Sequence, residues 1–144
     1  VCNEGSGDLC DVDEYCTGTA GAECPTDTVA PSTTVCRPGS GDMCDPDEYC
    51  TGSADQECPA DVILPTTTVC NEGSGDLCDV DEYCTGTAGA ECPTDTVAPS
   101  GTTCRPGSGD MCDPDEVCTG TADEACPADV ILPTTTVCNE GSGD

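Results

Sequence analysis

One arrangement of cysteines recurs along the whole chain and limits what it can fold into. Four cysteines, separated by 8, 6, 8 and 12 residues, return every 34 residues without a slip. The copies cover residues 1–34, 35–68, 69–102 and 103–136, and a fifth begins over 137–144. Helical 34-residue repeats need an apolar helical period, whereas Pro and Gly interrupt every copy here. We therefore predict a tandem array of 34-residue units with little regular secondary structure, as a window of a longer array.

The composition says what must hold such units together. Of 144 residues, 17 are cysteine, while Phe and Trp are missing and Tyr occurs three times. Cysteine above roughly 8–10% of a chain signals a disulfide scaffold, and large aromatic side chains supply much of an ordinary core. Disulfides must therefore replace burial, as in small secreted domains. We predict a small disulfide-rich repeat protein located outside the cell or on its surface.

The charge excludes several function classes. The formal net charge is −28, with two arginines and neither lysine nor histidine. Nucleic acid and anionic membrane surfaces are therefore not expected partners, and no apolar run is long enough to insert into a membrane. An enzyme is not expected either, because no nucleophile has a base and all copies carry the same groups. Such a chain repels itself unless cations bind.

An acidic segment flanked by cysteines is the densest feature of each copy. In the second copy it reads Cys44-Asp-Pro-Asp-Glu-Tyr-Cys-Thr-Gly and is closed by Cys58-Pro-Ala-Asp61. Calcium takes six to eight oxygen ligands, mostly carboxylates and carbonyls. Each copy is therefore a candidate calcium site that disulfides hold in shape. The alternative is that these acids form a solvated face.

The copies alternate in two forms. The first and third differ only at Thr33 and Gly101, and the second and fourth differ at five positions. The larger unit is thus 68 residues. Alternation indicates either that successive copies face different surroundings or that a two-copy unit was duplicated.

The cysteines themselves favour structural disulfides over zinc or catalysis. Zinc sites need cysteines two to four residues apart or histidines, and neither is present. Acidic neighbours raise rather than lower a thiol pKa, which argues against a reactive thiol. Four cysteines per copy leave several pairings open from spacing alone.

The string C-R-P, then C-D-x-x-E-x-C-T-G, then C-P-x-D resembles the C-terminal half of the disintegrin domain of snake-venom metalloproteinases and their membrane-bound relatives. It spans about 27 of the 34 residues in each copy. The resemblance implies a calcium site made by three carboxylates and two backbone carbonyls. Carried over by position, the ligands are Asp11, Val12, Glu14, Asp27 and Thr28; Asp45, Pro46, Glu48, Asp61 and Val62; Asp79, Val80, Glu82, Asp95 and Thr96; and Asp113, Pro114, Glu116, Asp129 and Val130.

The resemblance also implies a disulfide pairing. The first cysteine of a copy would pair with its Cys-Pro cysteine, as Cys2–Cys24, Cys36–Cys58, Cys70–Cys92 and Cys104–Cys126. The second would pair with the third cysteine of the next copy, as Cys10–Cys50, Cys44–Cys84 and Cys78–Cys118. A local Cys10–Cys16 bond is the alternative. The loop that recognises integrins in that family reads RPGSGDM here, without Arg before Gly-Asp, so integrin binding is not expected.

A Thr-rich tract follows the last proline of each copy. Ser and Thr beside Pro are typical of O-glycosylated stalks, although an ordinary extended linker is the alternative. The candidate acceptors are Ser32, Thr33, Thr34, Thr66, Thr67, Thr68, Ser100, Thr102, Thr103, Thr134, Thr135 and Thr136.

Two functions follow from these features. The first is a structural segment of an extracellular fibre, stalk or surface appendage, rigidified by disulfides and structural calcium, in which chains self-associate. The second is a disintegrin-like adhesion module that presents repeated Gly-Ser-Gly-Asp loops and gains avidity from repetition. A calcium buffer is a third reading.

Overall fold

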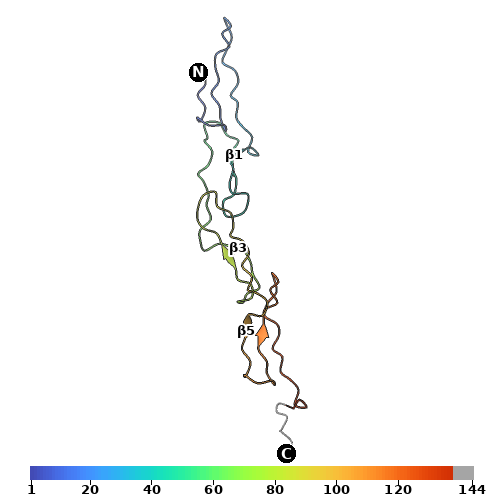
Figure 1. Ribbon diagram of the computed structural model, residues 1–144. Coiled ribbons are helices and arrows are strands. Elements are labelled where there is room, and N and C mark those ends of the chain that lie inside the picture. The colour runs from blue at the N-terminus through green and yellow to red at the C-terminus, as the bar shows by residue number, and fades with distance from the viewer. Residues whose placement is uncertain (138–144) are drawn as a thin grey trace, which may run out of the picture. The chain divides into compact units, whose positions relative to one another are not determined.

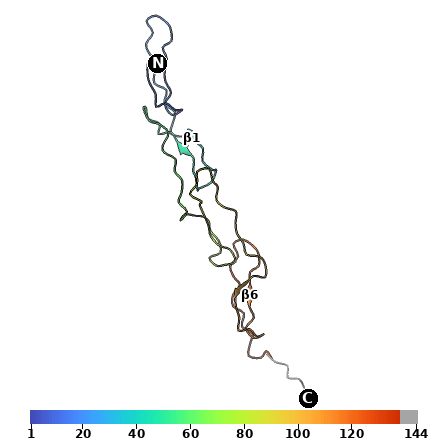
Figure 2. The same ribbon diagram turned by 60° about the vertical axis from the view of Figure 1, so that its left-hand side comes forward.

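The computed structural model of the protein describes residues 1–137. The predicted start of a fifth copy at 137–144, with Cys138, therefore lies outside the described residues apart from Val137. Short strands are the only regular elements over residues 1–137, and that part of the chain holds no helix suited to crossing a membrane. Three antiparallel pairs form; Figure 1 labels the first strand of each, and Figure 2 labels β1 and β6. They are β1 (Val35–Arg37) with β2 (Glu48–Tyr49), β3 (Val69–Asn71) with β4 (Glu82–Tyr83), and β5 (Thr103–Arg105) with β6 (Glu116–Val117).

Each pair joins the first cysteine segment of a copy to its acidic segment. The register places Arg37 opposite Glu48, Asn71 opposite Glu82, and Arg105 opposite Glu116. The first copy makes the same contact as an isolated bridge between Asn3 and Glu14. The pairing therefore fixes the backbone of every predicted glutamate ligand.

The buried centre of the described chain consists of sulfur and carboxylates. The buried apolar residues are all cysteines: Cys10, Cys44, Cys50, Cys78, Cys84 and Cys118. Beside them lie buried acids, among which Asp11 and Asp79 are each 1% exposed. A chain without Phe or Trp has little else to bury, so cross-links take the place of an apolar core.

Disulfides join residues 22 and 40 positions apart. The 22-residue pairs lie within one copy, as Cys2–Cys24, Cys36–Cys58 and Cys104–Cys126. The 40-residue pairs join neighbouring copies, as Cys10–Cys50, Cys44–Cys84 and Cys78–Cys118. These are pairs that the family resemblance implies. The local Cys10–Cys16 alternative does not form, because Cys16 is a free, exposed thiol. Cys70, Cys92 and Cys112 are also disulfide-bonded, and the pairing of Cys70 with Cys92 stays a prediction.

The contacts group into two compact units. One comprises Val1–Thr68 with Cys84–Cys92, and the other comprises Val69–Tyr83 with Pro93–Asp144. The first unit takes residues 84–92 from the third copy because Cys84 is bonded to Cys44. The division of the chain into 34-residue domains stays a prediction.

The Thr tracts depart in part from the expected extended conformation. Each makes a turn in which a Thr N–H donates to the proline carbonyl three residues earlier, as from Thr34 to Pro31 at 2.9 Å. The Thr34 carbonyl then accepts from the N–H of Cys50 in the next copy, also at 2.9 Å. Proline at the first position fixes the φ that a turn requires, which overrides the strand preference of threonine. Most of the candidate acceptors are exposed, whereas Thr34, Thr68, Thr102 and Thr136 are half-buried.

Candidate metal centre

The three predicted carboxylates of the first copy come together at one place. Asp11 is fully buried and Glu14 is 6% exposed, whereas Asp27 is exposed on the outer side. The Asn3 side chain links two of them, since its Nδ2 lies 3.3 Å from Glu14 Oε2 and 3.1 Å from Asp27 Oδ1. The backbone N–H of Thr28 donates to Glu14 Oε1 at 2.8 Å. The segment after the Cys-Pro dipeptide is thus anchored on the glutamate.

One oxygen of the central aspartate has no partner. Oδ2 of Asp11 accepts from the backbone N–H of Asp55, while the buried Oδ1 makes no hydrogen bond. The same oxygen is orphaned in Asp45 and Asp79. A buried carboxylate oxygen without a partner is costly, and a bound cation would satisfy it.

The acids perturb one another electrostatically. Partial desolvation is the largest influence, followed by the charges of Asp11 and Glu14, and together with Asp55 these raise the pKa of Asp27. Asp95 repeats the effect in the third copy, where desolvation and then Asp79 and Glu82 raise its pKa. Like charges held this close favour binding of a cation.

A glycine lets the loop close over the aspartate. A Cβ at Gly5 would lie 2.1 Å from the Asp11 carbonyl oxygen and 2.8 Å from the Val12 carbonyl carbon. The next residue, Ser6, donates its N–H to the same Asp11 carbonyl at 3.0 Å. The Gly-Ser turn therefore packs against the peptide that follows the aspartate and hydrogen-bonds to it. This contact holds the backbone that carries the predicted Val12 carbonyl ligand. The turn recurs with Gly39, Gly73 and Gly107.

The other copies repeat this arrangement with differences. Asp45, Glu48, Asp79, Glu82 and Glu116 are buried, as in the first copy. The backbone N–H of Val62, Thr96 and Val130 donates to the glutamates Glu48, Glu82 and Glu116 at 2.8–2.9 Å. Asp113 is half-buried, and Asp61, Asp95, Asp129, Pro46, Val80 and Pro114 lie on the exposed side or at its edge.

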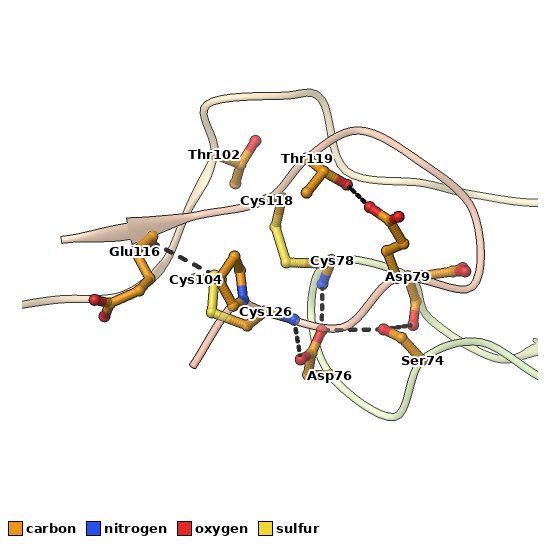
Figure 3. The surroundings of a disulfide bond; sticks show 12 residues. Ser74, Asp76, Cys78, Asp79, Thr102, Cys104, Glu116, Cys118, Thr119 and Cys126 are labelled. Carbon is orange, nitrogen blue, oxygen red and sulfur yellow. Dashed lines mark hydrogen bonds between the residues drawn. A yellow bond between two sulfur atoms is a disulfide. The ribbon is translucent and has the colours of Figure 1, made fainter. Parts of the chain in front are cut away.

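The oxygen ligands do not yet form a closed shell. Over residues 1–137, the only groups of three potential ligand atoms within 4.8 Å of one another are sulfurs, such as those of Cys78, Cys104 and Cys126. Those sulfurs belong to the disulfides Cys78–Cys118 and Cys104–Cys126, which lie side by side in Figure 3, so they are not free thiolate ligands. In the first copy the Asn3 amide lies between the carboxylates of Glu14 and Asp27.

The donor set fits calcium better than any transition metal. Each copy offers three carboxylates and two adjacent carbonyls, and one of the three acids is exposed. Hard oxygen ligands of this number suit calcium, and Oδ1 of Asp11, which accepts no hydrogen bond, has lone pairs free to coordinate the ion.

Sequence reasoning missed the role of a fourth aspartate. Oδ1 of Asp76 accepts from the N–H of Cys78 at 2.9 Å and its Oδ2 from the N–H of Cys126, as Figure 3 shows. Asp8 and Asp42 do the same toward Cys58 and Cys92. The signal is the Gly-Ser-Gly-Asp tetrapeptide that every copy repeats, which was considered above only as a loop that an adhesion module would present.

Comparison with known proteins adds no relative: no family model, curated protein or solved structure matches this chain. The relation to disintegrin domains therefore stays a resemblance of motifs.

Proposed function

We propose that the chain is a segment of an extracellular fibre, stalk or surface appendage, built from copies that disulfides join and calcium rigidifies. The many disulfides are typical of extracellular proteins. Four alike copies without a unique site suit a repetitive structural element. The copies would stack lengthwise, each touching its neighbours, and chains would associate with one another.

The observation that carries the proposal is the joint between copies. Cys10 is disulfide-bonded to Cys50 of the next copy, and both are buried. Two aspartates flank that bond and accept backbone N–H groups of the next copy, Asp11 from Asp55 and Asp8 from Cys58. A joint with one covalent and two charged contacts resists bending. It recurs at Cys44–Cys84 and at Cys78–Cys118.

Calcium would stiffen the same joint. Asp11 belongs both to the predicted ligand set and to the contact with the next copy. An ion held by Asp11, Glu14 and Asp27 would therefore fix the first copy against the second. The carbonyls of Val12 and Thr28 would complete the shell with water. Neutralising these acids would also relieve part of the self-repulsion of the chain.

The adhesion module is less well supported. Its recognition element would be the Gly-Ser-Gly-Asp loop, yet Asp8 at the loop end is occupied by Cys10, Cys58 and Ser6. A carboxylate held by three internal donors is not available to a receptor.

Solution scattering on the oxidised 144-residue chain, with calcium and with chelator, tests the proposal. A compact chain of this length has a radius of gyration of about 15 Å. A stiff array would exceed twice that value, with a cross-section that stays constant along the particle. A radius near the compact value would overturn the structural proposal, and one that is equally large and rigid in chelator would remove calcium from it.

A further inference from the structure

The candidate cation sites differ between alternate copies in the residue that faces the glutamate. Asn3 donates to Glu14 Oε2 at 3.3 Å, and Asn71 donates to Glu82 Oε2 at 3.2 Å. The second and fourth copies place arginine there. Nη1 of Arg37 lies 3.5 Å from Glu48 Oε2, and Nη1 of Arg105 lies 3.7 Å from Glu116 Oε2. A neutral amide thus alternates with a fixed positive charge.

The arginines are held in place rather than free to swing away. Nη1 of Arg37 donates to the Pro59 carbonyl at 2.6 Å, and that of Arg105 to the Pro127 carbonyl at 2.7 Å. The buried Oε2 of Glu48 and of Glu116 makes no hydrogen bond. The guanidinium therefore acts on that oxygen as a nearby charge, in the position where a bound cation would also act.

The following copy adds a second difference. The residue that donates its N–H to the buried aspartate is Asp55 for the first site and Asp123 for the third, but Gly89 for the second. Asp55 and Asp123 take left-handed backbone conformations, with φ of 58° and 62°, matching the φ of 71° at Gly89. An acidic side chain thus borders the first and third sites, and its charge contributes to the raised pKa of Asp27 and Asp95.

The two kinds of site carry different charges. The first site has Asp11, Glu14, Asp27 and Asp55, which sum to −4. The second has Asp45, Glu48 and Asp61 with Arg37, which sum to −2. Calcium affinity follows the number of charged ligands and their neighbours.

We propose that the chain carries two classes of calcium site, named after the residue that faces the glutamate. The Asn sites of the first and third copies bind calcium tightly. The Arg sites of the second and fourth copies bind it weakly, because the arginine already places a positive charge beside the glutamate. This inference rests on the proposed calcium function. In an Asn site, turning the side-chain amide would present its oxygen to the ion as a further ligand, because amide nitrogen and oxygen exchange places by a simple flip.

The alternation at these two positions then has a physical meaning. Each Asn site receives its fourth acid from the following Arg copy, and the Arg site of the second copy receives an uncharged glycine from the third copy. The joints at Cys10–Cys50 and Cys78–Cys118 would be rigid at low calcium concentration, and the joint at Cys44–Cys84 would stiffen only as the concentration rises.

Calorimetric titration of the oxidised chain with calcium chloride tests the two classes. We expect the dissociation constants to differ by about tenfold or more. Arg37→Asn with Gly89→Asp rebuilds the second site as an Asn site, so the number of tight sites should rise by one. The added Cβ at Gly89 meets nothing within 4 Å. Asn3→Arg with Asp55→Gly is the reverse exchange and should remove one tight site.

Controls separate local from general charge. Thr33→Asp with Thr67→Asp lowers the net charge by two at exposed positions, the same net change as the first variant makes, and should leave the number of tight sites unchanged. If the double variant fails to form its disulfides, Arg37→Gln replaces it, because this substitution removes the charge and keeps a long polar side chain. Calcium heats with one uniform class, unmoved by either exchange, would overturn the inference alone. No calcium heat in the wild-type chain would overturn the calcium function itself.

Discussion

Asp8 accepts a hydrogen bond at 2.6 Å from the backbone N–H of Cys58, which lies in the next copy. Its other oxygen accepts from the N–H of Cys10 at 2.8 Å. One carboxylate thus spans the disulfide Cys10–Cys50 and the disulfide Cys36–Cys58, and orients them against each other. Because the contact recurs at Asp42 and Asp76, it belongs to the repeat itself.

Removing this carboxylate should loosen one joint selectively. Asp42→Ala takes the acceptor from the N–H groups of Cys92 and Cys44. We expect the Cys92 amide to lose protection from hydrogen exchange, because its N–H donates to the Asp42 carboxylate. Asp110→Ala is the matched control, since Asp110 accepts from Cys112 of its own copy. Unchanged protection at Cys92 in Asp42→Ala would contradict the role of this joint.

The same carboxylates should make stability fall in acid. Backbone hydrogen bonds, from Cys58 first and then Cys10, lower the pKa of Asp8 below its ordinary 3.8, and the equivalent bonds lower those of Asp42 and Asp76. A lowered pKa in the folded state means that the stabilisation is complete above 3.8 and is lost as the pH falls through the folded value. Carbon-13 titration of the aspartate carboxyls checks this, and a midpoint at or above 3.8 for Asp8 would contradict it.

The outer acids should titrate in the opposite sense. Desolvation and the charges of Asp11 and Glu14 raise the pKa of Asp27 above 3.8. In the calcium-free chain the ionised Asp27 therefore lowers the free energy of unfolding. This loss of stability disappears as the pH falls through the raised pKa and the carboxylate becomes protonated. Calcium should lower this pKa, since it favours the ionised form, and affinity should weaken as the pH falls through the raised value. Titrating Asp27 and Asp95 with and without calcium checks the shift, and coincident curves would speak against a bound ion.

The disulfide pairing was implied by the family resemblance, because four cysteines per copy leave several pairings open from spacing alone. The repeat length and the lack of helix followed from the regularity of the motif, whereas the meeting of Asp11 with Glu14 and Asp27 was implied by the family resemblance. The contact of Asp8 with Cys58 could not be predicted, since it depends on how one copy lies against the next. The sequence within one copy does not determine how that copy packs against the next.

The turn at Pro31 and the pairing of Arg37 with Glu48 were missed for a different reason. Threonine favours extended backbone in isolation, but proline at the head of the tract favours the turn. From the sequence, the alternation of the copies could mean either that successive copies face different surroundings or that a two-copy unit was duplicated. Only the strand register, which places Arg37 opposite Glu48, shows that the alternation faces a buried acid.

The Gly-Ser turn should tolerate no side chain at its first glycine. A Cβ at Gly39 would lie 1.9 Å from the Asp45 carbonyl oxygen, so Gly39→Ala must displace the peptide that carries Asp45 and the Pro46 carbonyl. Gly41→Ala is the comparison: its Cβ meets nothing within 4 Å, and only its φ of 94° opposes alanine, at a cost of about 1–2 kcal/mol. We expect Gly39→Ala to cost more in denaturant unfolding and to weaken calcium binding at the second site. Equal effects of the two substitutions would contradict the close packing.

The disulfides between copies should matter more than those within a copy. Cys10–Cys50 closes a separation of 40 residues and Cys36–Cys58 one of 22. Chain entropy alone gives about 3.9 and about 3.4 kcal/mol, a small difference. Burial enlarges it, because Cys10 and Cys50 are 2% and 3% exposed, whereas Cys36 and Cys58 are half-buried, so only the first pair leaves a cavity when shortened. In denaturant unfolding, Cys10→Ala/Cys50→Ala should therefore lose clearly more free energy of unfolding than Cys36→Ala/Cys58→Ala.

Mass spectrometry of unreduced fragments shows which bonds remain in each variant. Cys16→Ala, which removes the free thiol, controls for disulfide exchange. Equal losses would mean that the joint between copies is no stronger than the loop within each.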